Sequence, residues 1–226
     1  MKILVLLSGG VDSSTCLGLA ESRVGSKNVS ALSLHYGQRH DREIRAAKKV
    51  AEYYGVKQLE SDLSAPFMFS DCSLLVKNAN TIVHESYGEQ LAKMGGSGTV
   101  STYVPFRNGL FLSFAAAIAI SLGAEQIYYG AHGDDAVGRA YPDCTPEFYD
   151  AMNQAVYEGS GYTCRLEAPL LNMTKTDVVK TGLELKVPYQ YTWSCYEGGE
   201  QPCGTCATCL DRAKAFRENG VKDPAL

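Results

Sequence analysis

The segment LSGGVDSS, residues 7–14, combines residue types that bind a phosphate chain. Its glycines allow an anion to approach the backbone closely, and its serines add hydroxyl donors. An apolar run at residues 3–7 predicts a buried strand before the segment, and residues 13–22 predict a helix after it. The N–H groups at the start of such a helix favour a bound anion. We therefore predict that this turn binds phosphate through Leu7, Ser8, Gly9, Gly10, Asp12, Ser13 and Ser14.

Asp12 has a different task, because its carboxylate would repel phosphate; we expect it to hold the loop or to bind a cation. The turn is not a Walker loop, since no Gly-Lys-Ser/Thr follows, and it is not a Gly-x-Gly-x-x-Gly dinucleotide turn. It resembles the Ser-Gly-Gly-x-Asp-Ser loop of the ATP pyrophosphatases, which release pyrophosphate while adenylating a substrate oxygen. An ordinary glycine turn is the alternative. We expect an ATP site.

Four cysteines lie within fifteen residues, at Cys195, Cys203, Cys206 and Cys209. Four thiolates suit tetrahedral Zn²⁺, and two Cys-x-x-Cys spacings supply neighbouring ligands from short turns. An iron–sulfur cluster or a redox pair is the alternative, and the pattern favours these less. A zinc ion with four protein ligands has no open position, so we predict a structural role. The other cysteines, Cys16, Cys72, Cys144 and Cys164, are expected as small core residues, although a nucleophilic role for Cys144 stays open.

Predicted strands and helices alternate along the chain. Strands are predicted at residues 3–7, 29–36, 56–63 and 126–129, with a short extended piece at 166–170. Helices are predicted at residues 13–22, 41–55, 110–124, 146–158 and 174–185. This order predicts an α/β fold with a doubly wound parallel sheet. The resemblance of the loop to the ATP pyrophosphatases implies that this sheet is Rossmann-like, of the adenine-nucleotide α-hydrolase type. Ligands of such sheets bind outside the carboxyl ends of the strands, where residues 8–14 and 36–40 would lie.

The remaining segments suggest how the chain is divided. Residues 64–102 look irregular, and a loop of that length in a compact domain is usually functional, which predicts a lid or a substrate wall. We expect residues 1–190 to form an ATP-pyrophosphatase domain with a substrate loop at 64–107. Residues 191–226 would form a zinc-binding segment packed on it.

Composition excludes several classes of protein. The chain has 226 residues, of which 45% are hydrophobic, so global disorder is excluded. A formal net charge of −4 argues against a protein that grips nucleic acid over a wide surface. The longest apolar stretch, residues 110–124, is too short to span a membrane, and no secretory signal is visible. We therefore expect a cytoplasmic protein.

Three further motifs occur in order between the phosphate loop and the cysteines: YGQRH at 36–40, VPFRN at 104–108 and YPDC at 141–144. Together the five motifs resemble the 7-cyano-7-deazaguanine (preQ0) synthases, the QueC family, from end to end. The resemblance implies adenylation of the carboxylate of 7-carboxy-7-deazaguanine by ATP, displacement of AMP by ammonia, and a second activation that leaves the nitrile. It also implies Mg²⁺, one zinc ion on four cysteines, a homodimer and a product used in queuosine or archaeosine formation.

Residue types suggest roles in that reaction. As catalytic residues we expect Asp12, Lys175 and Arg107: Lys175 would stabilise the departing pyrophosphate, and Arg107 would pair with the substrate carboxylate or with phosphate. Asp134 and Asp135 suit Mg²⁺ by position. For the substrate we expect contacts from Arg39, His40, Arg107, Asn108, Tyr141, Asp143 and Cys144, with Asp143 on the guanine-like edge and Tyr141 stacked on the base.

The chain departs from the family pattern in two places. Phe106 stands where the usual motif is Val-Pro-Gly-Arg-Asn, and the loop at 130–140 is longer than usual. A relative that adenylates the same carboxylate and transfers it to an amine of a macromolecule, such as a protein, is therefore the main alternative. An enzyme that modifies tRNA directly and a zinc-ribbon module for nucleic acid are weaker alternatives, because the chain is acidic and few basic residues follow the cysteines.

Overall fold

Five parallel strands form the centre of the computed structural model, which describes residues 1–75 and 81–225. The strands lie in the order β3-β2-β1-β4-β5. Their bounds are Ile3–Leu6 (β1), Val29–His35 (β2), Lys57–Asp62 (β3), Gln126–Tyr128 (β4) and Arg165–Glu167 (β5). The central strand β1 pairs with β2 and β4 and is apolar throughout, as expected for a strand covered on both faces.

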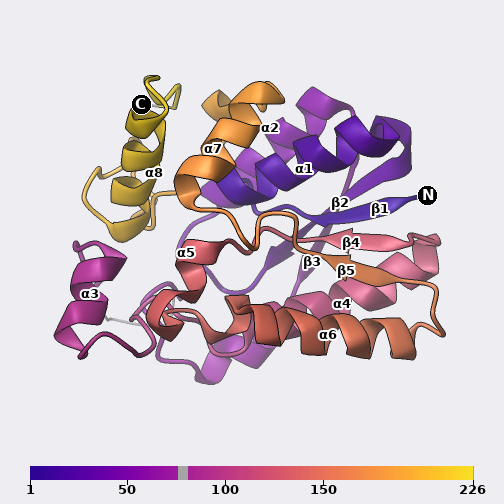
Figure 1. Cartoon of the computed structure of the whole chain (residues 1–226), viewed down its shortest axis with the longest axis horizontal. Coiled ribbons are helices and arrows are strands. Elements are labelled where there is room, and N and C mark those ends of the chain that lie inside the picture. The colour runs from indigo at the N-terminus through magenta and orange to yellow at the C-terminus, as the bar shows by residue number, and fades with distance from the viewer. Residues whose placement is uncertain (76–80, 226) are drawn as a thin grey trace.

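Helices cover both faces of the sheet (Figure 1). One layer contains α1 (Val11–Val24), α2 (Arg42–Tyr54) and α7 (Lys175–Glu184), with α8 (Ala207–Glu218) packed on α7. The other layer contains α4 (Arg107–Leu122) and α6 (Pro146–Gly159). The short helices α3 (Tyr87–Lys93) and α5 (Gly133–Ala136) lie beyond the carboxyl ends of the strands, on the left of Figure 1.

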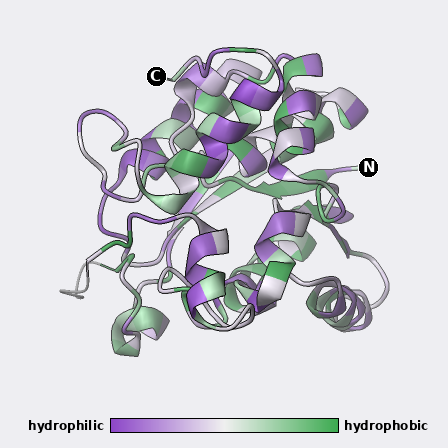
Figure 2. Cartoon of the chain, turned by 60° about the vertical axis from the view of Figure 1, so that its left-hand side comes forward, coloured by the Kyte–Doolittle hydropathy of each residue, from purple (hydrophilic) through white to green (hydrophobic). Residues whose placement is uncertain are grey.

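Alternating side chains of β1 supply both halves of the core. Ile3 and Val5 belong to the buried cluster that includes α1, α2, α7 and α8, whereas Leu4 belongs to the cluster with α4 and α6. Figure 2 shows the hydrophobic strands enclosed by helices whose outer faces are more hydrophilic. The predicted fold class, an α/β protein with a doubly wound parallel sheet, is therefore confirmed.

Residues 64–102 contain more regular structure than the sequence analysis predicted. A 3-10 helix occupies Ala65–Phe69, and α3 begins after Ser86, whose hydroxyl accepts a hydrogen bond from the N–H of Glu89. The Glu89 carboxylate in turn accepts from the N–H of Ser86, which completes a capping box. The Ser-x-x-Glu spacing was the available signal. Residues 76–80 of the predicted substrate loop lie outside the described part of the chain.

The C-terminal segment packs on the sheet domain. Ala215 and Phe216 of α8 belong to the same buried cluster as Ile3. The buried Arg212 guanidinium donates to both carboxylate oxygens of Asp223, at 2.6 and 2.8 Å, and so holds the last described turns against α8. The predicted boundary at residue 190 stays a prediction. In the described residues, every helix is too short or too polar to cross a lipid bilayer.

Candidate active site

The predicted phosphate loop joins β1 to α1. Gly10 is the N-cap of α1 and has no side-chain cap, so the first amides of this helix are not capped by a side chain of the loop. Ser8 Oγ lies 3.0 Å from Ser13 Oγ and accepts from the N–H of Gly10 at 3.3 Å. In these contacts the serine hydroxyls bond within the loop itself. The N–H groups at the start of α1 thus remain available, and an anion is stabilised at such a helix N-terminus.

Gly9 fits a place that a side chain cannot occupy. Its φ is +87°, and a Cβ there would lie 2.3 Å from the carbonyl oxygen of Glu43 and 2.4 Å from the nitrogen of Ala47. Helix α2 therefore packs directly against the backbone of the loop. The glycine that the sequence analysis assigned to anion approach also permits this contact between helix and loop.

Lys175 forms an ion pair with Asp12, although the two residues are far apart in the sequence. Lys175 Nζ lies 2.7 Å from each carboxylate oxygen of Asp12 and 3.4 Å from His132 Nε2. Burial alone would raise the pKa of Asp12, but Lys175 and His132 outweigh it and hold that pKa below its usual value. A lysine and a paired carboxylate thus stand beside the phosphate loop.

Two carboxylates position this lysine and its histidine neighbour. The Asp134 carboxylate accepts from the backbone N–H of Lys175 at 2.7 Å, which supports the first turn of α7. Asp135 Oδ2 lies 3.4 Å from His132 Nε2. Burial raises the pKa of Asp135, and the nearby His132 only partly offsets this. Asp135 and Asp211 face the cavity and offer the oxygen ligands that Mg²⁺ takes, whereas Asp134 is engaged by α7.

Arg107 occupies the first turn of α4 on the opposite side of the site. Its guanidinium carbon lies 5.4 Å from the centre of the Tyr36 ring, a cation–π distance. The next residue, Asn108, donates its backbone N–H to Asp143 Oδ2 at 2.9 Å. Its side-chain amide donates to the Asp143 carbonyl oxygen at 3.1 Å and to Cys144 Sγ at 3.2 Å. Asp143 therefore caps α4 from a distant segment.

A cavity of about 240 Å³ connects these groups. The phosphate loop contributes Leu7, Ser8, Gly10, Asp12 and Ser13 to its lining. Of the other predicted site residues, the lining includes Arg107, Asn108, Tyr141, Cys144 and Lys175. Of the residues predicted to bind ATP or the substrate, five lie outside it, namely Gly9, Ser14, Arg39, His40 and Asp143.

The positions of these five residues have physical reasons. Gly9 backs onto α2, and Ser14 is fully buried in α1. His40 Nε2 lies 3.1 Å from the carbonyl oxygen of Cys195, and its ring fills the space above Gly198, where a Cβ would lie 2.2 Å away. His40 thus fastens the cysteine loop. Arg39 and His40 line a separate, more open groove beside β2.

Cys144 lines the cavity as a protonated thiol. Burial raises the pKa of Cys144 well above its usual value, and the carboxylates of Asp135 and Asp143 add to the effect. A nucleophilic cysteine needs the opposite shift, because the thiolate is the reactive form. The raised pKa and the place of Cys144 in the cavity lining therefore favour the substrate-lining role over the nucleophilic one.

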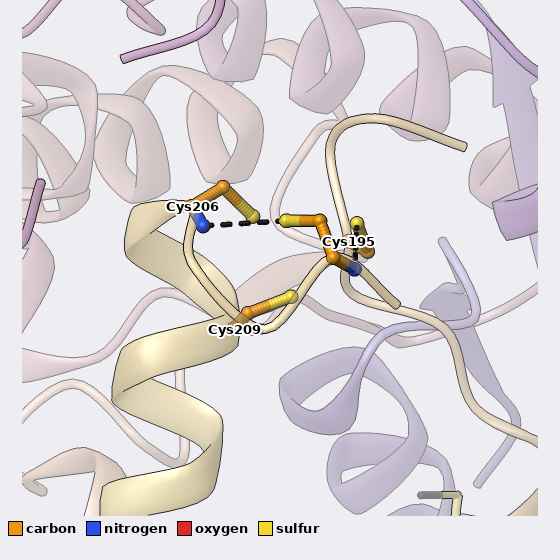
Figure 3. Close-up of side chains that lie close together, drawn as sticks. Cys195, Cys206 and Cys209 are labelled. Carbon is orange, nitrogen blue, oxygen red and sulfur yellow. Dashed lines mark hydrogen bonds between the residues drawn. The ribbon is translucent and has the colours of Figure 1, made fainter. Parts of the chain in front are cut away.

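The four cysteines of the C-terminal segment converge. The sulfur atoms of Cys195, Cys203, Cys206 and Cys209 all lie within 4.8 Å of one another. Zn–S bonds of ~2.3 Å in a tetrahedron place sulfurs ~3.8 Å apart, so this cluster fits a zinc ion. Figure 3 shows the side chains of Cys195, Cys206 and Cys209 turned toward a common space at the start of α8.

Comparison with known proteins identifies the family. Residues 2–220 match the family model described as "Queuosine biosynthesis protein QueC". The chain belongs to the QueC family. It is 43% identical over 226 residues to the 7-cyano-7-deazaguanine synthase of Oceanobacillus iheyensis, covering 99% of this chain and 96% of the relative. It is also 43% identical over 227 residues to the 7-cyano-7-deazaguanine synthase of Archaeoglobus fulgidus, covering 100% and 90%.

Solved structures share the fold at low sequence identity. The NMN synthetase of Francisella tularensis aligns with a TM-score of 0.52 and 15% identity, over 98% of this chain and 78% of that one. A predicted subunit of tRNA methyltransferase from Methanocaldococcus jannaschii aligns with a TM-score of 0.50 and 14% identity, over 81% and 76%. These similarities show that the QueC chain adopts a fold found in other proteins.

The structure shows the contacts of Phe106, one departure from the QueC motif. Phe106, which precedes α4, has φ +54°, a left-handed conformation that glycine adopts without strain. Its ring lies over Gly109, where a Cβ would meet ring atoms at 2.4 Å, and makes an edge contact with Phe148 at 6.0 Å. In this chain an aromatic side chain thus covers the start of α4, at a backbone position that suits glycine.

Several cavity residues were missed by the sequence analysis. Glu43, Tyr87, Tyr196 and Asp211 all line the cavity. The hydroxyls of Tyr141, Tyr87 and Tyr196 form a hydrogen-bonded chain that begins at Thr102, whose Oγ1 lies 2.6 Å from Tyr141 OH. Only the fold brings together residues so far apart in sequence. Asp211 offered a local signal, since it follows Cys209 of the cysteine cluster on one helix.

Proposed function

We propose that the chain converts 7-carboxy-7-deazaguanine, ammonia and ATP into 7-cyano-7-deazaguanine, with release of AMP and pyrophosphate. One observation carries the proposal: a single cavity joins a phosphate-binding loop, the Lys175–Asp12 pair and Arg107. Support also comes from membership of the QueC family and from curated relatives named as synthases of this product. Those names give no support to the alternative of transfer to a macromolecule.

The reaction balances as two adenylations. The substrate carboxylate attacks the α-phosphorus of ATP and expels pyrophosphate, and ammonia then displaces AMP, which keeps one carboxylate oxygen. The resulting amide oxygen attacks the α-phosphorus of a second ATP and expels a second pyrophosphate. Loss of AMP, which keeps the amide oxygen, and of a proton from nitrogen then leaves the nitrile.

In these steps, some residues of the cavity would act on ATP and its Mg²⁺, and Arg107 would act on the substrate carboxylate. The loop amides and Ser8 would bind the phosphates, and Lys175 would stabilise the charge that develops on pyrophosphate. Arg107 would orient the carboxylate, since its fixed donors match two oxygens. Asp135 and Asp211 are the candidate ligands for Mg²⁺, which would neutralise phosphate charge. The zinc ion would be structural.

A product assay tests this function. The protein is incubated with ATP, Mg²⁺ and 7-carboxy-7-deazaguanine, with and without ammonium, and small molecules are identified by mass spectrometry. We expect nitrile and AMP only when ammonium is present. An adenylate or amide that accumulates in the presence of ammonium, or a mass increment on a protein, would favour the transfer reaction. Absence of AMP under every condition would exclude this substrate.

A further inference from the structure

We propose that Glu43 recognises the base, by accepting hydrogen bonds from the ring N–H and the 2-amino group of the deazaguanine edge. The inference rests on the proposed function, and it names the residue that selects the substrate. The sequence analysis assigned this task to Asp143. In the structure the Asp143 carboxylate accepts from the backbone of Asn108 and lies outside the cavity lining, so another acceptor is needed.

Glu43 has a fixed position in the cavity. It lies in the first turn of α2, and its own carbonyl oxygen packs against Gly9, where even a Cβ would approach to 2.3 Å. This close contact seats the helix on the phosphate loop and sets where the Glu43 side chain enters the cavity. A residue held in this way has the defined placement that recognition of a rigid base requires.

The Glu43 carboxylate has no hydrogen-bond or ion-pair partner within residues 1–75 and 81–225. Two other acids of the cavity have partners: Asp12 pairs with Lys175, and Asp135 lies beside His132. Asp211 also feels Lys175 and His132 electrostatically. Glu43 differs from these three acids, because the charge that acts on its pKa is that of Arg107, which also acts on Asp135, and not that of Lys175.

Charge complementarity selects the ligand group. A carboxylate only accepts hydrogen bonds, and its two oxygens match two parallel N–H donors. The deazaguanine has such a donor pair on its six-membered ring and an anionic carboxylate on its five-membered ring. Glu43 and Arg107 offer the opposite pair, one acceptor and one cation, in one cavity. A base bound between them would satisfy both side chains.

The pKa of Glu43 is consistent with a carboxylate that lacks hydrogen-bond donors. Burial raises the pKa of Glu43 to about 7, and the Arg107 guanidinium only partly opposes this effect. Two donors from a bound base would replace the water that burial removes and would stabilise the ionised form.

The test combines a substitution with a substrate analogue. Glu43→Gln keeps the size of the side chain but replaces one acceptor oxygen by a donor. We expect the KM for 7-carboxy-7-deazaguanine to rise about tenfold to a hundredfold, as for loss of one charge-assisted hydrogen bond. The KM for ATP should change less than about threefold. The wild-type protein should discriminate by a similar factor against the analogue that lacks the 2-amino group, and Glu43→Gln should largely lose that discrimination.

Controls distinguish loss of base recognition from misfolding and from failure of the proposed function. Glu52→Gln makes the same change at an exposed position of the same helix and should leave both KM values unchanged. A thermal melt of Glu43→Gln checks that the variant folds, and Glu43→Asp should recover part of the discrimination. An unchanged KM for the base, or a larger effect on the KM for ATP, would overturn the assignment. Wild-type protein that forms no AMP would instead refute the proposed function itself.

Discussion

Lys175 Nζ contacts both carboxylate oxygens of Asp12 at 2.7 Å, although 163 positions separate the two residues in the chain. Asp12 belongs to the first turn of α1 and Lys175 to the first turn of α7, so two helix N-termini meet at this ion pair. Both ends carry partial positive charge. The pair therefore marks the point at which the fold gathers the groups that stabilise a departing pyrophosphate.

Replacement of Lys175 tests that role. We expect Lys175→Met to lower the rate of AMP formation about a hundredfold to a thousandfold, because a cation preorganised for developing charge is lost. The pKa of Asp12 should rise as well, since burial would then act without its main counterion. Steady-state kinetics and NMR titration measure the two effects. Lys180→Met, at an exposed position of the same helix, is the control; equal rates in both variants would contradict the assignment.

Gly9→Ala tests the contact between loop and helix. The new Cβ would overlap backbone atoms of Glu43 and Ala47, and the residue would keep a positive φ. We expect a loss of about 2–4 kcal/mol in the free energy of unfolding, from overpacking and left-handed strain together. Gly55→Ala also has a positive φ but no atom within 4 Å, and should lose only about 1–2 kcal/mol. Urea unfolding compares the two, and equal losses would refute the contact.

Phe106 and Gly109 should be energetically coupled. Gly109→Ala places a Cβ against the Phe106 ring and should destabilise the protein, whereas the same change in a Phe106→Gly background should not. The expected coupling is about 1–3 kcal/mol, the range for residues in direct contact. A double-mutant cycle of thermal or urea unfolding measures this energy. Additive effects would mean that the ring does not cover Gly109.

Zinc binding should order residues 81–93, the segment from which Tyr87 reaches the cavity lining. Ile82 packs with three of the cysteines, and His84 lies 2.6 Å from Thr205 Oγ1 and 2.9 Å from Glu197 Oε1. We expect Cys206→Ser to lose the zinc ion and to increase hydrogen exchange in residues 81–93. The control Cys164→Ser alters a buried cysteine outside the cluster and should retain one zinc ion per chain. Unchanged hydrogen exchange of residues 81–93 in the zinc-free variant would show that the metal does not order this segment.

The pH dependence of base binding should report Glu43. Its pKa of about 7 means that the carboxylate form, which accepts two hydrogen bonds, becomes dominant only above that pH. Arg107 and Tyr36 face the same carboxylate, and both keep their charge state through this range. We expect kcat/KM for the base to rise with pH and to level above about 7. In Glu43→Gln this rise should disappear; a persistent rise would assign the titration to another group.

The sequence predicted the parts of this protein that depend on local pattern. The apolar run of β1, the glycine turn and the helix after it identify the phosphate loop, since each follows from neighbouring residues. The cysteine spacing likewise predicted a cluster that the fold brings together. Local chemistry and order along the chain were sufficient for the fold class.

Pairings across the fold could not be predicted in this way. Asp143 and Glu43 are both acidic residues near loop and helix starts, and only tertiary structure shows that Asp143 caps α4 while Glu43 faces the cavity. His40 was assigned to the substrate by its motif, yet it packs against the cysteine loop. Such outcomes depend on contacts between segments far apart in the chain, which periodicity and propensity do not encode.

Isotope transfer tests the central claim, adenylation of the substrate carboxylate, most directly. The substrate is prepared with ¹⁸O in both carboxylate oxygens, and AMP and pyrophosphate are analysed by mass spectrometry after conversion to nitrile. Direct adenylation predicts two AMP molecules per nitrile, each with one ¹⁸O, and unlabelled pyrophosphate. Unlabelled AMP, or ¹⁸O in pyrophosphate, would contradict the account, because the carboxylate oxygen would then not have attacked the α-phosphorus of ATP.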